Sequence, residues 1–489
     1  MSRDFSARVL PDVPVTALAD ADRPGEALDA ARAVDPGAII DLLDGSGLRG
    51  RGGAGFPAAR KWRTVAANRT DVLPSTVVVN AAEGEPGSFK DRAILRADPY
   101  RVIEGALIAA HAVGADSVIV ATKASFTREQ ERLQAAIDEI GRAGWTERVP
   151  VTLVTGPGEY LFGEETALLE VIDGRPPFPR IAPPYREGVD EVFEHRDDTA
   201  SGTGSAAHVE MAGPGDATVA PPTLASNTET FANVPAIVRN GADWFRELGT
   251  PDSPGTVVCT VSGDTERAGV AEVELGTPLR EVLEQLGGGA RDGHELLAVM
   301  SGVANPLLPA NAFDTPVSYE AMRAAGSGLG AAGFIVFDDA TDLVAVAAGI
   351  SRFLAVESCG QCRHCKDDGL ALAALLAQLT ASRAGERDVD EITHRLDFVA
   401  EGARCNLAAQ QQVVVGSVLQ QFPELVAAHV SGAAVAVEPV EIASIVDLVD
   451  GRVVLDDAQR TKQPDWTHDA VDSGQWPADR LDDHRAGTS

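Results

Sequence analysis

Residues 75–92, STVVVNAAEGEPGSFKDR, are the segment that best indicates the architecture of the chain. The segment opens with the β-branched run Thr76–Asn80, which is typical of a buried strand. Similar runs follow at Ser117–Thr122 and Val149–Thr155, and helical patterns separate the three runs at Pro99–Val113 and Thr127–Arg142. This alternation predicts βαβ units with a mainly parallel sheet. We therefore expect an α/β fold in the first half of the chain.

Two other patterns follow. Residues 256–339 contain two strand-like runs, a helical pattern at Thr277–Leu286, and two more strand-like runs at Ala298–Ser301 and Gly333–Phe337. This order favours a β-grasp-like domain over a Rossmann half. The next block predicts a bundle of four short helices, at Leu343–Val356, Gly369–Ser382, Val389–Ala400 and Ala408–Phe422.

These patterns predict five segments. They are an N-terminal extension (1–33), an α/β domain (34–245), a β-grasp domain (256–339), an all-α four-helix domain (340–430) and an acidic tail (431–489). Within the α/β domain, residues 186–221 are acidic and show no helical or strand period, so we expect a flexible insertion there. We also expect the tail to be largely disordered, apart from a short strand at Val453–Leu455.

The composition excludes several classes of function. The 489 residues include 41 basic and 73 acidic residues, and the net charge is −32. Such a chain repels phosphate backbones and anionic lipids, which disfavours nucleic-acid binding. Its most apolar long stretch, 102–120, is interrupted by Glu104, His111 and Asp116, and the first ten residues do not resemble a signal peptide. We therefore expect no direct membrane insertion and a cytoplasmic location, either free or peripheral to a membrane complex.

Four of the five cysteines form the strongest chemical signal. Cys359, Cys362 and Cys365 follow the pattern C-x2-C-x2-C, and Cys405 lies further along the chain. Three thiolates in one loop and a distant fourth suit a [4Fe–4S] cluster. Zinc remains an alternative, although zinc sites usually take paired C-x2-C ligands, and a purely structural role is a third interpretation. We expect His364 to be a neighbour rather than a ligand, and the fifth cysteine, Cys259, to be a small core residue.

A glycine-rich segment precedes the first strand. Gly50, Gly52 and Gly55 formally satisfy G-x-G-x-x-G, but a predicted helix precedes them, so the Rossmann fingerprint is not met. Small residues here would let backbone N–H groups approach an anionic or planar ligand, with Lys61 supplying a positive charge. A merely flexible loop is the alternative, but it leaves the basic residues of this segment unexplained.

Two further loops carry polar residues directly after predicted strands, at 80–92 and 156–166. The carboxyl ends of parallel strands are where α/β folds commonly bind ligands. In the second loop, Gly163 can offer its N–H group closely to a ring system, and Tyr160 can cover one face of the ring. The alternative is an ordinary strand-to-helix turn with acidic residues at the helix N-terminus.

Together, these motifs resemble those of the NADH-binding flavoprotein subunit of respiratory complex I and its relatives in NAD-reducing hydrogenases and NAD-dependent formate dehydrogenases. The matching strings are GLRGRGGAGFP from Gly47, EGEPGSFKDR from Glu83, GEETALLE from Gly163, SNTETFANVP from Ser226 and ESCGQCRHC from Glu357.

The resemblance implies hydride transfer from NADH to FMN, followed by single-electron transfer to a [4Fe–4S] cluster and on to a partner protein. The partner would be an iron–sulfur acceptor, either ferredoxin-like or a thioredoxin-like [2Fe–2S] subunit. The implied cluster ligands are Cys359, Cys362, Cys365 and Cys405. Glu85 and Glu165 would lie near the nicotinamide, Lys61 would face phosphate, and Phe56 and Tyr185 would sandwich the adenine. The residues implied to hold FMN or to complete its loops are Gly50, Gly52, Asn80, Glu83, Tyr160, Gly163, Glu164, Asn227 and Thr230.

The sequence departs from the family pattern at four positions. Ala82 replaces an acid, Ser226 replaces the first of two asparagines, Thr64 replaces an aromatic residue and Ala182 replaces a lysine. These changes support an alternative in which the chain is an electron-wiring or assembly subunit that has lost NADH turnover.

Overall fold

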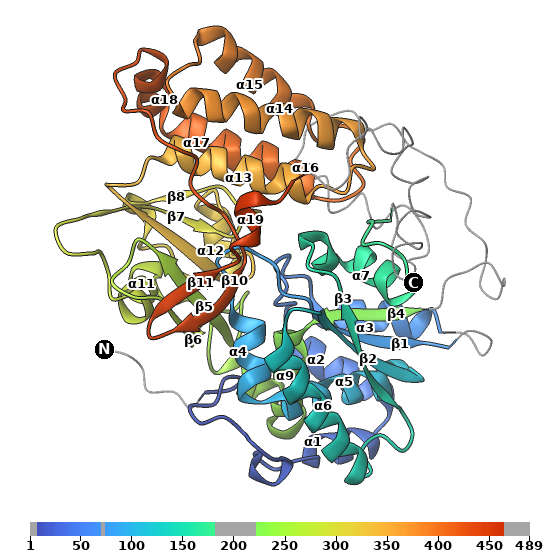
Figure 1. Cartoon of the computed structure of the whole chain (residues 1–489). Coiled ribbons are helices and arrows are strands. Elements are labelled where there is room, and N and C mark those ends of the chain that lie inside the picture. Colours follow the sequence, from blue (N-terminus) through green and yellow to red (C-terminus); the bar gives the residue numbers. More distant parts are fainter. Residues whose placement is uncertain (1–6, 70–73, 181–221, 464–489) are drawn as a thin grey trace.

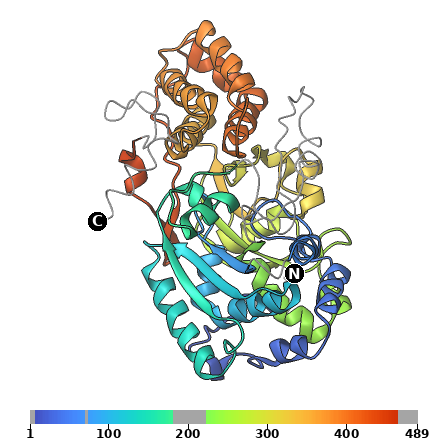
Figure 2. The same ribbon diagram turned by 90° about the vertical axis from the view of Figure 1, so that its right-hand side faces the viewer.

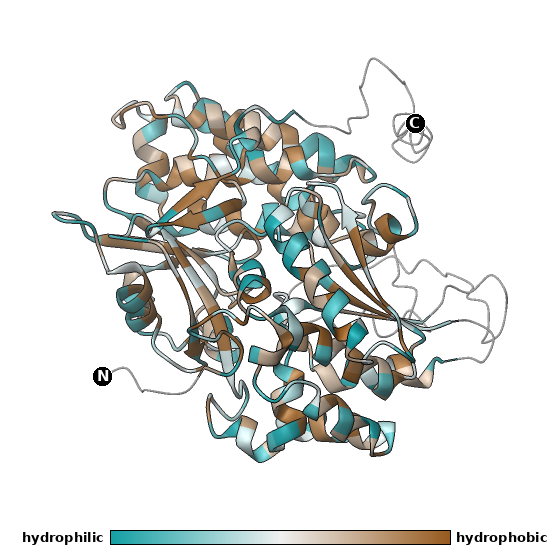
Figure 3. Cartoon of the chain, turned by 60° about the horizontal axis from the view of Figure 1, so that its bottom comes forward, coloured by the Kyte–Doolittle hydropathy of each residue, from teal (hydrophilic) through white to brown (hydrophobic). Residues whose placement is uncertain are grey.

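The computed structural model describes residues 7–69, 74–180 and 222–463. Its described residues form an α/β part, a second sheet and a helical part (Figure 1). The view in Figure 2 shows the helical part at one end of the molecule, beyond both sheets. Figure 3 shows that the strands are largely apolar, whereas the outer helices alternate apolar and hydrophilic stretches.

The first sheet has four strands in the order β3-β2-β1-β4, and all of its pairings are parallel. The three predicted strands are confirmed as β1 (Thr76–Ala81), β2 (Ser117–Lys123) and β3 (Val151–Gly156). The fourth strand, β4 (Thr223–Asn227), was not predicted. It is short and polar at its end, so its sequence lacks a clear strand signal.

Helices surround this sheet. The predicted helices are confirmed as α5 (Pro99–Val113) and α6 (Thr127–Arg142). The helix predicted before the glycine-rich segment is α2 (Pro36–Ser46), and the Asp35 side chain caps it by accepting a hydrogen bond from the Gly37 N–H group. The remaining α-helices of this part are α1 (Glu26–Arg32), α3 (Ala58–Ala67), α4 (Lys90–Ala97), α7 (Glu165–Ile172), α9 (Thr228–Asn240) and α10 (Ala242–Arg246).

The second sheet has the order β6-β5-β9-β7-β8. Strands β5 and β9 are parallel, and the other pairings are antiparallel. Alternate residues face opposite sides. Val299 and Val336 pack in the core beneath α11, whereas Ala298 and Met300 pack against the helical part. The elements are β5 (Thr256–Gly263), β6 (Gly269–Glu274), α11 (Leu279–Gly287), β7 (Leu296–Ser301), β8 (Leu308–Pro309), α12 (Tyr319–Ala324) and β9 (Gly333–Asp338).

The helical part contains helices at all four predicted places. A π-helical turn at Gln411–Val415 interrupts the last of them. The helices are α13 (Leu343–Glu357), α14 (Arg363–Thr380), α15 (Glu386–Phe398), α16 (Leu407–Gln410), α17 (Gly416–Gln421) and α18 (Pro423–Val430). Within the described ranges, no single helix is long and apolar enough to cross a membrane. Only the pair Leu407–Gln421 and Pro423–Val430, bent by 82°, meets the length and composition criteria together.

The prediction of disorder beyond residue 430 is wrong for residues 431–463. This segment forms β10 (Ile445–Val449), β11 (Arg452–Leu455) and α19 (Ala458–Thr461), of which only the strand at Val453–Leu455 was predicted. We call residues 438–463 the C-terminal strap. The strap lies tightly on α13, because the Val440 N–H group donates to Ala345 O at 2.9 Å and a Cβ atom at Gly349 would lie 1.9 Å from Val440 O.

Four of the predictions lie outside the described residues. The proposed acidic insertion at 186–221 falls within 181–221, as do Tyr185 and Ala182, and residues 464–489 of the tail are also not described.

Candidate functional site

The loops after β1 and β3 meet at the carboxyl edge of the parallel sheet, although β2 lies between the two strands. The Asn80 Nδ2 group donates to Gly163 O at 2.8 Å. A Cβ atom at Gly163 would lie 3.2 Å from Ala82 O, which is tighter than an ordinary contact. The structure therefore brings together Asn80 and Gly163, which the sequence assigned to one cofactor.

The glycine-rich loop packs against the start of α9. The Arg51 N–H group donates to Thr230 Oγ1 at 2.9 Å, and the Gly50 N–H group donates to Phe56 O at 2.8 Å. A Cβ atom at Gly52 would lie 3.2 Å from Asn227 Cβ. The loop is held by specific hydrogen bonds, which does not favour the alternative of a merely flexible segment. It also lies beside both Asn227 and Thr230, which were predicted for the cofactor.

A buried charge network fixes Asn227. The Lys90 ammonium donates to Asn227 Oδ1 at 2.9 Å and lies 2.7 Å from Asp91 Oδ1 and 3.0 Å from Glu229 Oε2. Burial by itself lowers the pKa of Lys90, but the Asp91 and Glu229 carboxylates outweigh it and raise the pKa. Sequence analysis missed this network, although Lys90 lies within one of the matching strings.

Lys61 and Glu165 form an ion pair at 2.8 Å between Nζ and Oε2. The other carboxylate oxygen of Glu165, Oε1, is buried and has no hydrogen-bond partner among the described residues. Buried acceptors are normally satisfied, so this oxygen fits a ligand that offers a hydroxyl or amide donor. Phe56 is half-buried nearby on the same segment as Lys61, and the Arg60 guanidinium lies 5.6 Å from the centre of its ring.

Two of the predicted acids accept several hydrogen bonds from the chain. Glu83 accepts from Ser88 Oγ at 2.7 Å and from the Asp91 N–H group at 3.2 Å. Glu164 caps α7 by accepting from the Thr166 and Ala167 N–H groups at 2.9 and 2.8 Å. Burial raises the pKa of both carboxyl groups, and for Glu83 the neighbouring Asp91 adds to the effect.

Glu85 and Tyr160 connect the three parts of the molecule. The Tyr160 hydroxyl donates to Glu85 Oε2 at 2.6 Å, and the Val303 N–H group, in the turn after β7 of the second sheet, donates to Glu85 Oε1 at 2.6 Å. From the helical part, Gln410 Nε2 donates to the Tyr160 hydroxyl at 3.3 Å, and the Phe353 ring meets the Tyr160 ring edge-on with centroids 5.3 Å apart. Burial raises the pKa of both Glu85 and Tyr160. No sequence pattern indicated this connecting role.

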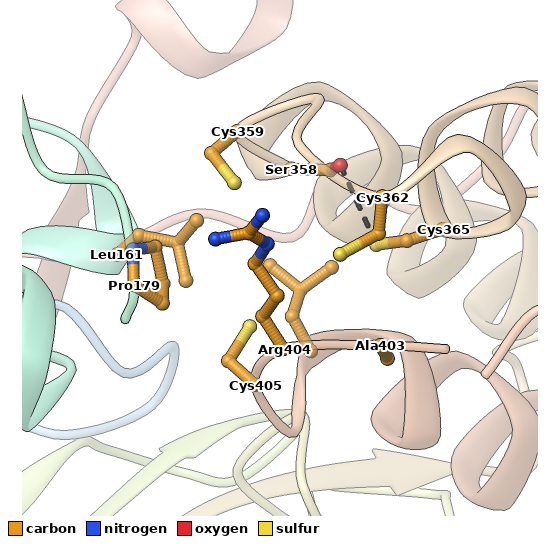
Figure 4. A pocket seen from close by; sticks show the side chains of 10 residues that line it. Leu161, Pro179, Ser358, Cys359, Cys362, Cys365, Ala403, Arg404 and Cys405 are labelled. Atoms are coloured by element: carbon orange, nitrogen blue, oxygen red, sulfur yellow. Dashed lines mark hydrogen bonds between the residues drawn. The ribbon is translucent and has the colours of Figure 1, made fainter. Parts of the chain in front are cut away.

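The four clustered cysteines line one small cavity (Figure 4). Cys359 and Cys362 come from the loop after α13, Cys365 lies in α14, and Cys405 precedes α16. The described residues that line the cavity include no carboxylate and no imidazole. His364 points elsewhere and pairs with Asp368 at 2.9 Å, and Cys259 is fully buried in β5, as predicted. Four thiol ligands around one space fit a [4Fe–4S] cluster.

The surroundings of the thiols also suit cluster sulfur ligands. Gln361 Nε2 donates to Cys359 Sγ at 3.5 Å, and Ser358 Oγ lies 3.5 Å from Cys365 Sγ. Burial raises the pKa of Cys365 to about 12 and also raises the pKa values of Cys359 and Cys405. Without metal these three thiols therefore favour the protonated form, and metal binding must displace their protons.

Two family models match this chain, one over the loops assigned to the flavin and one over the four cysteines. A family model described as the Nuo51 FMN-binding domain matches residues 43–236. A second, described as the NADH-ubiquinone oxidoreductase-F iron-sulfur binding region, matches residues 345–429. The second match favours the cluster over the zinc alternative.

Relatives that match over most of the chain agree. The F subunit of NADH-quinone oxidoreductase from Rickettsia felis is 32% identical over 404 residues, covering 81% of this chain and 89% of the relative. The corresponding protein of Rhodobacter capsulatus is 38% identical over 72% of this chain and 78% of its own length. Among solved structures, an NAD⁺-reducing [NiFe]-hydrogenase in the H₂-reduced state has a TM-score of 0.71 and 32% identity, with 86% of this chain and 66% of that chain covered.

Proposed function

The chain belongs to the family of NADH-quinone oxidoreductase F subunits, and we propose that it is the NADH-oxidising flavoprotein subunit of an electron-transfer complex. One observation carries this proposal. Leu161 lies on the loop after β3, two residues before Gly163, and it also lines the cavity of the four cysteines. The loop assigned to the flavin and the cluster cavity are therefore adjacent.

We assign FMN to the space between the glycine-rich loop, the ends of β1 and β4, and the loop after β3. Gly50 and Gly52 let the backbone approach the ligand, and Asn227 is held in one orientation by Lys90. The tight contact of Gly163 with Ala82 O leaves little room for a side chain at Gly163. The full set proposed to hold FMN is Gly50, Gly52, Asn80, Glu83, Gly163, Asn227 and Thr230.

We assign NADH to the neighbouring residues. Lys61 supplies a cation for the pyrophosphate, and the unpartnered Glu165 Oε1 supplies an acceptor for the nucleotide. Phe56 offers a stacking surface for the adenine, with Tyr185 as its proposed counterpart. Glu85, proposed from the sequence to lie near the nicotinamide, is engaged with Tyr160 and Val303, so its part is to fix the loop beside the nicotinamide.

These residues would hold FMN, which would supply an acceptor for a hydride from NADH and a source of single electrons for a [4Fe–4S] cluster. The chain's own residues act by positioning. Tyr160 and Glu164 hold the loop between the two cofactors, and Cys359, Cys362, Cys365 and Cys405 hold the cluster.

We also propose the domain assignment that the sequence indicated: an α/β domain at 34–245, a β-grasp domain at 256–339 and a four-helix [4Fe–4S] domain at 340–430. Numbered within the second domain, the strand order β6-β5-β9-β7-β8 is 2-1-5-3-4 with one helix packed on the sheet, which supports the β-grasp assignment.

The sequence contains five cysteines, and four of them belong to the cluster site, so onward electrons pass to a separate protein. We propose an iron–sulfur partner, either a thioredoxin-like [2Fe–2S] subunit or a ferredoxin-like protein. We further propose that the chain is cytoplasmic and peripheral to a membrane complex.

Cofactor analysis tests the proposed function. Protein reconstituted without oxygen with FMN, iron and sulfide is expected to retain about one FMN and four iron atoms per chain, and to reduce ferricyanide with NADH. Protein that retains neither FMN nor iron after desalting would refute the proposal.

A further inference from the structure

We propose that Arg404 is a cation that raises the reduction potential of the [4Fe–4S] cluster, an inference that rests on the proposed function. Arg404 directly precedes the ligand Cys405 and lines the cysteine cavity. Figure 4 shows its side chain extending into the space between Cys359, Cys362 and Cys405. Among the described residues, no other cationic side chain lines this cavity.

Arg404 differs from its neighbours in how its charge is paired. Within the described part of the chain, no carboxylate forms an ion pair with its guanidinium. Arg363, which also adjoins a cysteine ligand, differs in this respect, because its Nε atom lies 3.2 Å from Asp367 Oδ2. A guanidinium stays protonated at every working pH, so Arg404 brings a full positive charge to the sulfur atoms.

A second cation, Lys366, lies near the cavity. Lys366 is buried, and its ammonium donates to Ala355 O at 3.0 Å and Ser358 O at 2.5 Å. These carbonyl groups fix Lys366 in place and leave its charge, so it contributes a constant positive background at the site. Arg404 is exposed and directly precedes Cys405, so its charge can be removed by substitution without opening the core.

The effect on the cluster follows from charge. A [4Fe–4S] cluster with four thiolate ligands is an anion, and one-electron reduction adds one more negative charge. A neighbouring cation stabilises the reduced form more than the oxidised form, and N–H donors to the sulfur atoms act in the same direction. Arg404 therefore raises the reduction potential and favours electron transfer onto the cluster.

The test is a redox titration of the full chain carrying its cluster, followed by EPR of the reduced cluster. Arg404→Met removes the charge, Arg404→Lys retains it, and Arg363→Met is the matched control. We expect Arg404→Met to lower the equilibrium constant for reduction about tenfold, a shift of ~59 mV for one electron. Arg404→Lys and Arg363→Met should stay near the unaltered protein.

Equal potentials for Arg404→Met and the unaltered protein, at equal iron content, would overturn the proposal, because the guanidinium would then turn away from the cluster. If the methionine variant loses iron, Arg404→Gln keeps polar N–H donors without the charge and gives the same comparison. Iron and sulfide analysis of the unaltered protein separates this result from failure of the proposed function, which would leave no cluster to titrate.

Discussion

The carboxylate of Glu357 accepts a hydrogen bond from the Tyr160 backbone N–H group at 3.0 Å. Glu357 is the last residue of α13, immediately before the cysteine loop, and Tyr160 lies in the loop assigned to the flavin. The same carboxylate receives Lys462 of the C-terminal strap, with 3.0 Å from Nζ to each oxygen. One buried side chain thus joins the two cofactor loops to the strap.

Replacing Glu357 should destabilise the protein. Glu357→Ala removes the acceptor of the Tyr160 N–H group and the carboxylate that pairs with Lys462, so the free energy of unfolding should fall by about 3 kcal/mol. Glu357→Gln keeps an acceptor for Tyr160 and should lose less. Urea unfolding measures both variants, and an alanine variant as stable as the unaltered protein would contradict the role assigned to this contact.

We assign different roles to Cys405, a proposed cluster ligand, and Cys259, a core residue. Cys405→Ser should abolish the EPR signal of the reduced cluster and lower its iron content. Cys259→Ala should keep the cluster, and its free energy of unfolding should fall by about 1 kcal/mol because Cys259 is fully buried. Loss of the cluster in the Cys259 variant alone would reverse the assignment.

Lys61 should act on NADH binding rather than on turnover. A cation that contacts phosphate equally before and during the reaction contributes uniform binding, so Lys61→Met should raise KM about tenfold with kcat little changed. The matched control is Arg63→Met, since Arg63 lies on the same helix and pairs with Asp41 at 3.1 Å. Steady-state kinetics with ferricyanide checks this, and an unchanged KM in the Lys61 variant would contradict the assignment.

Lys123 should make stability depend on pH. It lies at the end of β2 and donates to Gly158 O at 3.0 Å, and burial lowers its pKa to about 8. Between pH 8 and the unfolded pKa of about 10.4, Lys123 is neutral in the folded protein but protonated in the unfolded chain. The free energy of unfolding therefore rises with pH across this range and is lowest at its acid end.

Relative to Lys123→Met, the unaltered protein should gain about 2 kcal/mol of unfolding free energy from pH 8 to pH 10. Denaturant unfolding of the two proteins at both pH values gives this difference directly. All other titratable groups are present in both proteins, so their contributions cancel in the difference. A constant difference would show that Lys123 keeps its ordinary pKa.

Local sequence patterns predicted the regular elements well, because each element carries its own signal. The helices at Pro99–Val113 and Thr127–Arg142 have the observed bounds. Both carry an apolar period, and the first is also capped by Asp98 and ends at Gly114. The strand β4 was missed, and so was the C-terminal strap apart from its strand at Val453–Leu455. Their order depends on contacts with distant segments, such as Val440 on α13, which a local pattern does not contain.

In the candidate site, too, local motifs predicted some features, and packing between distant segments determined the others. The motifs brought Asn80 close to Gly163, and the four cysteines to one cavity, as expected from the sequence. The connecting role of Tyr160 and the position of Arg404 depend on how separate parts of the chain pack together. Ala82 lies in a buried apolar cluster that includes Phe162, so the family's usual acid is replaced here by a side chain that suits its surroundings.

The central claim is that this chain passes electrons from NADH through FMN to its own cluster. An anaerobic NADH titration of the reconstituted protein, with flavin absorbance and cluster EPR recorded on the same samples, tests it most directly. We expect the flavin absorbance to bleach as the signal of the reduced cluster appears. A bound flavin that stays oxidised under NADH, beside a cluster that dithionite reduces, would contradict the claim and leave the chain as an electron-wiring subunit with a different donor.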